Sequence, residues 1–227
     1  MIPTTDFSIR SLCGGYDQNF SYVVTCTRTG AQLIIDAAVG IKQISPFLRD
    51  QPGAILITHS HGDHIAHLDQ YIEAFPKVII LGHPDSSEFL KIKKFKSLKN
   101  NQLFKIGDLP FAAIHTPGHY YDSICYQLDS ILFTGDTLFV GRTGRVISIK
   151  SDIADLYDSV YNKILTMAEN TRIYPGHDYG ETPTITLNEN IKISPLLQAK
   201  SFKDFQQKMD EYEQIFGLCF KMKLAGQ

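Results

Sequence analysis

The sequence Thr58-His59-Ser60-His61-Gly62-Asp63-His64 places three imidazoles and a carboxylate within six consecutive positions. A short apolar run, Ala54-Ile55-Leu56-Ile57, lies directly upstream and predicts a buried strand. The glycine at 62 favours a tight turn after that strand, so that the polar side chains converge instead of alternating across a sheet. Imidazole nitrogens and carboxylate oxygens are ligands that borderline-soft divalent metal ions prefer. The stretch therefore predicts a metal site, against the alternative of a surface loop that happens to be rich in histidine.

Three more candidate ligands follow strand-like apolar runs and glycine-containing turns: His119 after 111–114, Asp136 after 131–134 and His177 after 172–174. In α/β folds the loops at one end of a sheet carry the chemistry. Any one of these turns alone is equally consistent with a structural turn that has a polar residue at its tip. Four such turns in one chain indicate a shared site.

Hydrophobic runs that alternate with helical patterns place the first half of the chain in a layered α/β fold. The patterns predict strands at 7–12, 22–24, 33–35, 54–57, 78–81, 111–114, 124–128, 131–134 and 171–174, the first of them an edge strand. They predict helices at 41–48, 68–75 and 152–165, the last capped by Ser151, and a closing helix from Ser201 onward.

Length and composition are typical of a soluble globular protein. The 227 residues suit a single domain over 1–227 with a short helical tail at about 200–227. A net charge of −2 gives no reason to expect a nucleic-acid partner. Six lysines at 91, 93, 94, 96, 99 and 105 predict a solvated face, with a cationic rim for an anionic substrate as the alternative.

Cysteine spacing and the N-terminal sequence bear on the compartment. Four scattered cysteines without a CxxC pair, at 13, 26, 125 and 219, predict reduced and mostly buried thiols. Residues 1–6 lack the basic and apolar regions of a signal peptide, and no run has the length of a membrane span. We therefore expect a cytoplasmic protein with no membrane partner.

The stretch 58–64 resembles the THxHxDH signature of the metallo-β-lactamase superfamily, and His119, Asp136 and His177 fall in order where its other ligands belong. The resemblance covers residues 7–200. It implies an α/β fold of four layers, the αββα sandwich: two mixed β-sheets that face each other, helices on the outer faces, and a metal site along one edge.

Within that superfamily the chain looks most like the glyoxalase II group. The resemblance implies a dinuclear site, with His59, His61 and His119 on the first metal, Asp63, His64 and His177 on the second, and Asp136 bridging them. Two divalent cations lower the pKa of a shared water and polarise a carbonyl, so no serine or cysteine nucleophile is needed. Zinc is the expected metal, with iron or manganese as alternatives. Asp63 and Asp136 would act as the catalytic carboxylates together with the metal-bound hydroxide.

Three more residues are assigned roles by the same resemblance. Arg145 sits where relatives place a basic residue that helps to hold a substrate carboxylate, and a solvated loop cation is the alternative. Tyr179 lies where a substrate-contacting tyrosine occurs, and a packing role is the alternative. Asp36, at the end of a predicted strand, would orient the histidine loop by hydrogen bonds. The remaining histidines are taken as non-ligands: His67, His83 and His115.

Some features depart from glyoxalase II. Residues 178–227 are too few for its long helical C-terminal region, and 174–179 match the Tyr-Pro-x-His-Asp-Tyr run of persulfide dioxygenases. Those enzymes use one iron, on residues matching His59, His119 and Asp136. Both groups usually carry Gly-Cys-Gly before the basic residue, where this chain has Arg142-Thr143-Gly144, and Tyr120 replaces a usual threonine. These changes imply an altered substrate pocket.

Three functions remain open from the sequence. The first is a dinuclear metal hydrolase that acts on a thioester or related acyl compound, with a small-molecule substrate such as a conjugate of glutathione or another thiol. The second is a dioxygenase with a single Fe(II) that acts on glutathione persulfide. The third is a non-enzymatic metal-binding or interaction module, which a closed site of four ligands would support. A homodimer is compatible with each of them.

Overall fold

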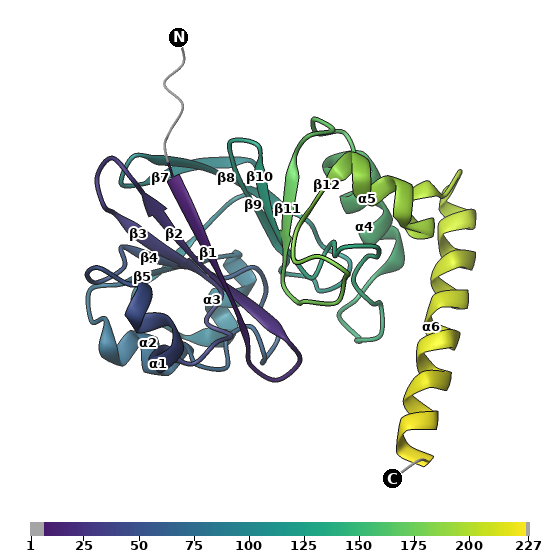
Figure 1. Ribbon diagram of the computed structural model, residues 1–227, viewed down its shortest axis with the longest axis horizontal. Helices are drawn as coiled ribbons and strands as arrows, with labels where there is room; N and C mark the ends of the chain where they lie inside the picture. The colour runs from purple at the N-terminus through teal and green to yellow at the C-terminus, as the bar shows by residue number, and fades with distance from the viewer. Residues whose placement is uncertain (1–6, 226–227) are drawn as a thin grey trace.

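Two groups of six strands form two separate sheets that face each other (Figure 1). The computed structural model describes the backbone of residues 7–225, and the side chains of that range except those of residues 89 and 215–225. The N-terminal sheet contains β1 (Phe7–Gly14), β2 (Asn19–Cys26), β3 (Gln32–Ile35), β4 (Ala54–Leu56), β5 (Ile79–Gly82) and β6 (Phe95–Ser97). The C-terminal sheet contains β7 (Gln102–Ile106), β8 (Leu109–His115), β9 (Ile124–Leu128), β10 (Ile131–Gly135), β11 (Arg172–Pro175) and β12 (Ile185–Thr186).

Both sheets are mixed. In the N-terminal sheet β1, β2 and β3 pair antiparallel, and β3, β4, β5 and β6 pair parallel. In the C-terminal sheet only β10 and β11 pair parallel, and the other neighbours pair antiparallel. The parallel strands bring the carboxyl ends of β4, β10 and β11 to loops that carry the candidate ligands. The topology thus positions the site.

The main core lies between the two sheets, because each contributes one apolar face to it. Tyr22 and Leu56 of the N-terminal sheet belong to the same buried cluster as Phe111 and Phe133 of the C-terminal sheet. Val23, between two inward-facing residues of β2, packs on the opposite face of its sheet. Strands buried on both faces explain why the sequence shows continuous apolar runs there rather than alternation.

Helices cover the outer faces. α1 (Ile41–Ile44), the 3₁₀ segment η1 (Ser45–Phe47), α2 (Leu68–Ala74) and α3 (Pro84–Leu90) lie on the side of the N-terminal sheet (Figure 1). The other side holds α4 (Ile153–Tyr157), the π-helical segment η2 (Asp158–Ile164), α5 (Leu187–Ile193), the 3₁₀ segment η3 (Pro195–Gln198) and α6 (Phe202–Ala225). Leu68 and Tyr71 pack on one sheet, and Leu156 and Phe205 on the other. The predicted αββα sandwich is confirmed.

Several local predictions were wrong. The α-helix expected over 41–48 ends at Ile44 and continues as a short 3₁₀ turn, because Pro46 has no backbone NH to donate. Phe47, expected on the buried side of that helix, is 39% exposed. Asp152, not Ser151, caps α4, because its carboxylate accepts hydrogen bonds from the backbone of Ala154 and Asp155. The patterns missed α3, β6, β7, β12 and α5, which are short or lie in polar sequence.

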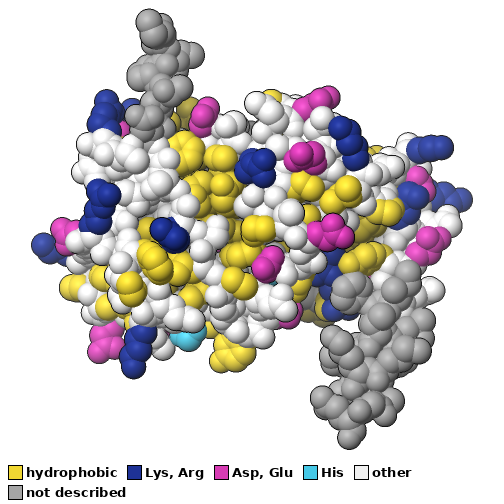
Figure 2. All heavy atoms as spheres, viewed as in Figure 1, with side chains coloured by type: hydrophobic (Ala, Val, Ile, Leu, Met, Phe, Trp, Pro, Cys, Tyr) yellow, Lys and Arg dark blue, Asp and Glu magenta, His cyan; other side chains and the backbone are white. Residues whose placement is uncertain are grey.

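The lysine-rich stretch and two of the cysteines lie as the sequence predicts, and a third cysteine does not. All six lysines between 91 and 105 are exposed, as expected of a solvated face. Cys26 and Cys125 are buried as predicted, but Cys13 is exposed, because it lies near the end of the edge strand β1. Cys219 is outside the described side chains. Figure 2 shows basic and acidic side chains interspersed on one face. None of the described helices combines the length and apolarity that crossing a bilayer requires.

Candidate metal centre

The histidine loop leaves β4 and is held from below by Asp36, which follows β3. The carboxylate of Asp36 is buried and accepts hydrogen bonds from the backbone NH and the hydroxyl of Thr58, at 2.8 and 2.7 Å. It also accepts a hydrogen bond from Nδ1 of His64, at 2.8 Å. Asp36 adopts a φ of +55°, a conformation that aspartate tolerates better than most residues. One carboxylate therefore fixes both the start of the loop and one of its imidazoles.

Two further imidazoles arrive from the other sheet. His119 lies in the loop after β8, and its Nδ1 donates to the backbone carbonyl of Arg145, at 2.8 Å. His177 follows β11, and its Nδ1 donates to the carbonyl of Asp17, at 2.7 Å. Asp136 follows β10 directly. Loops from both sheets thus meet at one edge of the sandwich.

The partners of the Nδ1 atoms decide which nitrogen of each ring faces the centre. An imidazole that donates through Nδ1 keeps its lone pair on Nε2. This holds for His64, His119 and His177. The Thr58 hydroxyl donates to Asp36 and lies 3.2 Å from Nδ1 of His59, so it accepts from that nitrogen. In their neutral forms, these four rings therefore present Nε2 lone pairs to the centre of the site.

These lone pairs converge on one another. Nδ1 of His61 lies 2.9 Å from Nε2 of His59 and 3.1 Å from Nε2 of His119. Nε2 of His64 and Nε2 of His177 are 3.3 Å apart. Facing lone pairs repel each other unless a proton or a cation lies between them. The donor set thus fits a metal ion of borderline softness.

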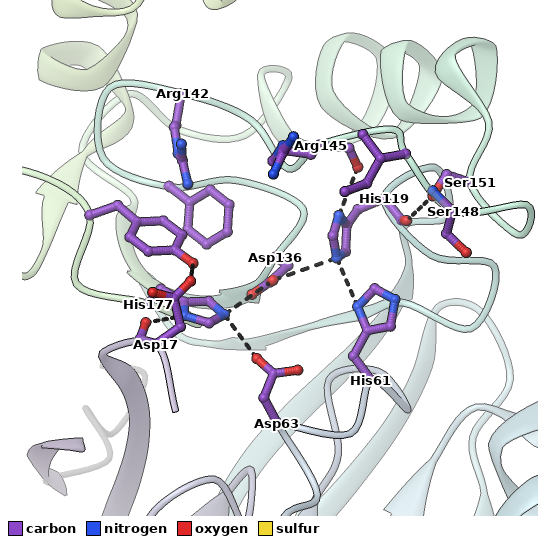
Figure 3. Close-up of a pocket in the computed structure, with 13 residues that line it drawn as sticks. Asp17, His61, Asp63, His119, Asp136, Arg142, Arg145, Ser148, Ser151 and His177 are labelled. Carbon is purple, nitrogen blue, oxygen red and sulfur yellow. Dashed lines mark hydrogen bonds and ion pairs between the residues drawn. The ribbon is translucent and has the colours of Figure 1, made fainter. Parts of the chain in front are cut away.

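The donor atoms fall into groups within which all atoms lie within 4.8 Å of one another: His59, His61 and His119; Asp63, His64 and His177; and His59, His64 and Asp136. Figure 3 shows Asp136 between His119 and His177. Its Oδ2 is 3.5 Å from Nε2 of His119 and 3.3 Å from Nε2 of His177, and its Oδ1 is 3.1 Å from Nε2 of His64. The two oxygens of the Asp136 carboxylate thus lie beside members of both outer groups.

Two observations test whether a metal suits these residues. Oδ1 of Asp136 is buried, yet it has no hydrogen-bond partner of acceptable geometry among the described residues. Gly176 gives the site its room, since a Cβ there would lie 2.2 Å from that oxygen and 2.6 Å from Cε1 of His64. At Gly62, by contrast, a Cβ would meet nothing within 4 Å, so the tight turn expected there does not require glycine. The orphaned oxygen and the converging nitrogens fit a bound cation.

Electrostatics divide the site into a neutral side and an acidic side. Burial lowers the pKa of His59 and His119, and burial together with the neighbouring His119 lowers the pKa of His61 to about 4. Burial alone would lower the pKa of His177, but Asp136 and Asp63 raise it to about 9. Burial would raise the pKa of Asp136, but His64 and His177 hold it well below its usual value. The acidic side, which Asp63 and Asp136 form next to His64 and His177, therefore attracts positive charge.

A cavity of about 340 Å³ opens over the cluster. His61, Asp63, His119, Asp136 and His177 line it, together with Arg142, Arg145, Phe139, Ile147 and Tyr179. Tyr179 stacks on the ring of His177 at 4.7 Å, and its hydroxyl donates to the carboxylate of Asp17. A volume of this size matches small-molecule sites.

Sequence patterns did not point to Asp17, Asn19 and Asp122. Asn19 is buried and donates to Oδ2 of Asp63 at 2.8 Å, so the β1–β2 turn reaches the cluster. Buried Asp122 accepts a hydrogen bond from the backbone of Ser60, at 3.2 Å, and one from the hydroxyl of Ser86, at 2.7 Å. Asp17 and Asn19 follow Gly14-Gly15 and have the local sequence of ordinary turn residues. Their contacts with the cluster are therefore seen only in the folded structure.

Comparisons with known proteins agree with this fold. A family model described as the metallo-β-lactamase superfamily matches residues 14–177. Hydroxyacylglutathione hydrolase of Francisella philomiragia is 31% identical over 198 residues, which cover 86% of this chain and 71% of that protein. "Probable hydroxyacylglutathione hydrolase glo2" of Schizosaccharomyces pombe is 30% identical over 73% of this chain, which spans only 66% of that protein's length. The crystal structure of ETHE1 from Myxococcus xanthus superposes with a TM-score of 0.79 at 26% identity, covering 89% of this chain and 90% of that one.

Proposed function

The chain belongs to the metallo-β-lactamase superfamily, and from its site we propose that it is a metal-dependent hydrolase that cleaves a thioester of a small thiol. The observation that carries the proposal is the pair of ligand groups joined at Asp136. Seven donor side chains exceed what one structural ion needs, and they border an open cavity rather than a closed core. The similarity to hydroxyacylglutathione hydrolases supports a thioester as the bond that is cleaved.

We propose that two divalent ions bind. His59, His61 and His119 would hold one, Asp63, His64 and His177 the other, and Asp136 would bridge them. Zinc is the proposed metal, because its usual ligands are imidazole and carboxylate, and iron and manganese accept the same set. When bound, the ions lower the pKa of a water and polarise the substrate carbonyl.

The chain's own residues would do the remaining work. Asp63 and Asp136 would present ionised carboxylates at the cavity floor, where they would accept hydrogen bonds from a water molecule. Arg145 lies at the cavity wall as a cation, and Phe139 and Ile147 offer apolar surface to an acyl group. Tyr179, stacked on His177, holds that ring in place through its hydroxyl bond to Asp17. Both roles weighed for Tyr179, substrate contact and packing, fit this position.

Metal analysis tests the proposal first. Protein purified without added metal is expected to contain about two ions per chain by mass spectrometry, and to hydrolyse small-molecule thioesters. Removal by a chelator should abolish turnover and lower the unfolding temperature, because bound ions stabilise only the folded state. One ion per chain, nearly all iron, with oxygen uptake on glutathione persulfide, would contradict the hydrolase and favour the dioxygenase that the second resemblance implies.

Asp36→Asn is expected to weaken metal binding by roughly 10- to 100-fold. The amide presents NH₂ where the carboxylate accepted from Thr58 and His64, so Nδ1 of His64 loses its acceptor or the ring proton moves to Nε2, which faces the centre. Competition with a chromophoric zinc chelator measures the change.

Asp122→Asn is the matched control for that variant. Asp122 is also buried under the histidine loop, but it contacts Ser60 and Ser86 and no proposed ligand. The Ser86 hydroxyl accepts as well as donates, so it tolerates the amide. Equal losses of zinc affinity in both variants would show that Asp36 has no special effect on His64.

Three further expectations stand as proposals. The core shared by the two sheets supports one domain over 1–227. A cytoplasmic location and a homodimer are also proposed, the first from the cysteine pattern. Fractionation of cells and size-exclusion chromatography test them.

A further inference from the structure

Helix α6 (Phe202–Ala225), near the far end of the chain, contacts the arginines of the cavity wall. Glu213 lies on it, and its carboxylate meets the guanidinium of Arg145 in two places. Nε of Arg145 is 2.9 Å from Oε2 and 3.1 Å from Oε1, and Nη2 is 2.8 Å from Oε2. This is a forked contact, in which a planar cation is matched to a planar carboxylate. An internal carboxylate therefore occupies the cavity-wall arginine.

Arg145 stands close to the proposed metal ligands. Its backbone carbonyl accepts the hydrogen bond that fixes His119, and its side chain lines the cavity (Figure 3). Arg145 and His119 line the same wall of the cavity, so an anionic group of a bound substrate can lie beside Arg145 while its reacting bond lies near His119. The residue is thus placed to recognise an anionic group of a substrate.

The neighbouring arginine is contacted from the same helix. Nη1 of Arg142 donates to the hydroxyl of Tyr212 at 3.0 Å, and its guanidinium lies 4.1 Å above the ring centre of Tyr179. Arg142 and Arg145 are the two arginines among the described residues that line the cavity. Consecutive residues of α6, Tyr212 and Glu213, therefore contact both. Through Glu213, the helix offsets the positive charge that Arg145 presents at the cavity wall.

The contact is only half shielded from water. The side chain of Arg145 is 38% exposed and that of Glu213 is 24% exposed. A substrate carboxylate that approaches Arg145 competes with the carboxylate of Glu213. The chain holds that carboxylate beside Arg145, so its effective concentration there is high. A neutral substrate meets no such competition. The arrangement therefore discriminates by the charge of the substrate's thiol part.

We propose that Glu213 determines specificity: its carboxylate occupies Arg145 in place of a substrate carboxylate, so the cavity selects thioesters whose thiol part is uncharged over those that carry a carboxylate. This inference rests on the proposed function, since it names the substrate class for the same cavity. The Glu213→Gln variant should weaken the discrimination while it keeps the size of the side chain.

Binding of two thioethers tests the proposal without any turnover. S-hexylglutathione carries carboxylates, and S-hexyl-N-acetylcysteamine is neutral, and neither contains a thioester to cleave. Isothermal titration calorimetry of the metal-loaded protein should show that Glu213→Gln binds S-hexylglutathione about five to ten times more tightly than the unsubstituted chain does. Affinity for the neutral thioether should stay the same. Glu213→Ala, which also removes the carboxylate, should behave alike.

Two controls assign the effect to the pair. Glu211→Gln removes the same charge from an exposed position two residues away on α6, where the side chain accepts a hydrogen bond from Gln207, and it should change neither affinity. In a double-mutant cycle, Arg145→Gln combined with Glu213→Gln should lose the gain for S-hexylglutathione, because the cation that the gain depends on is gone. A gain that persists without Arg145, or an equal gain in Glu211→Gln, would overturn the proposal.

The remaining outcomes separate this inference from the hydrolase. Unchanged affinities in Glu213→Gln, or no binding of either thioether to any variant, overturn the inference while thioester hydrolysis is judged by its own assay. If no thioester is cleaved but Glu213→Gln binds S-hexylglutathione more tightly as expected, the proposed hydrolase activity is wrong. The role of Glu213 in selecting against anionic ligands is then still supported. Melting temperatures that match across the variants show that each is folded.

Discussion

Asp136→Ala is expected to lower kcat/KM for thioester cleavage by at least about a thousandfold, which corresponds to roughly 4 kcal/mol of lost transition-state stabilisation. Asp136 is buried and borders both outer ligand groups, through Oδ1 toward His64 and Oδ2 toward His119 and His177. Its removal takes a donor from both proposed ions, and it removes the negative charge that offsets two imidazoles. Metal content per chain and steady-state kinetics measure the loss, and His59→Ala should also remove activity.

Asp63→Ala is the comparison that isolates the bridge. Among the proposed ligands, Asp63 lies beside His64 and His177, which belong to the second group, and its side chain is 30% exposed. The variant should lose mainly the second ion and retain the first. If Asp136→Ala kept two ions and normal turnover, or lost no more metal than Asp63→Ala, the bridging role would be wrong.

Gly118→Ala is expected to destabilise the fold by more than about 4 kcal/mol. The φ of Gly118 is +132°, and a Cβ there would lie 2.2 Å from the backbone nitrogen of Leu156 and 2.3 Å from its Cα. The carbonyl of Gly118 also accepts from the backbone of Asp152 at 2.9 Å, so α4 packs directly on this turn. For a chain of this length the melting temperature should fall by more than about 8 °C.

Gly62→Ala serves as the control for the glycine effect. It lies in the histidine loop, close to the same site, but an added Cβ would meet nothing within 4 Å. Its melting temperature should stay near that of the unsubstituted chain, which thermal unfolding followed by circular dichroism would show. A stable Gly118→Ala variant, or an equal loss in Gly62→Ala, would contradict the packing seen around Leu156.

The architecture was predictable from the sequence because several of its strands, β2, β3 and β4 among them, are buried on both faces and because the strands end in recognisable turns. The runs at 54–57, 111–114 and 131–134 fall on β4, β8 and β10, and the resemblance of 58–64 to a known signature supplied the layer order. Six of the seven candidate ligands follow these strands closely in the chain, and His177 follows β11. Local sequence therefore indicated where they lie. Their roles as ligands stay predictions until metal is measured.

The rest depends on contacts between residues that are far apart in the chain. Asn19 reaches Asp63 across 44 positions, and Arg145 meets Glu213 across 68 positions. A polar residue in a turn, or a glutamate on an amphipathic helix, is ordinary in its local sequence. Arg145 was weighed as a substrate contact or a solvated cation, and the structure adds a third partner, Glu213, that neither option included. No local pattern encodes such a pairing.

Each sheet is built from one continuous half of the chain, with β1 to β6 before residue 98 and β7 to β12 after residue 101. The first half brings His59, His61, Asp63 and His64, and the second brings His119, Asp136 and His177. Each half alone would hold an incomplete site. If the ions bind as proposed, they link the two halves of the chain, because each half supplies part of the ligand set. Their binding free energy then adds directly to the free energy that keeps the two sheets associated.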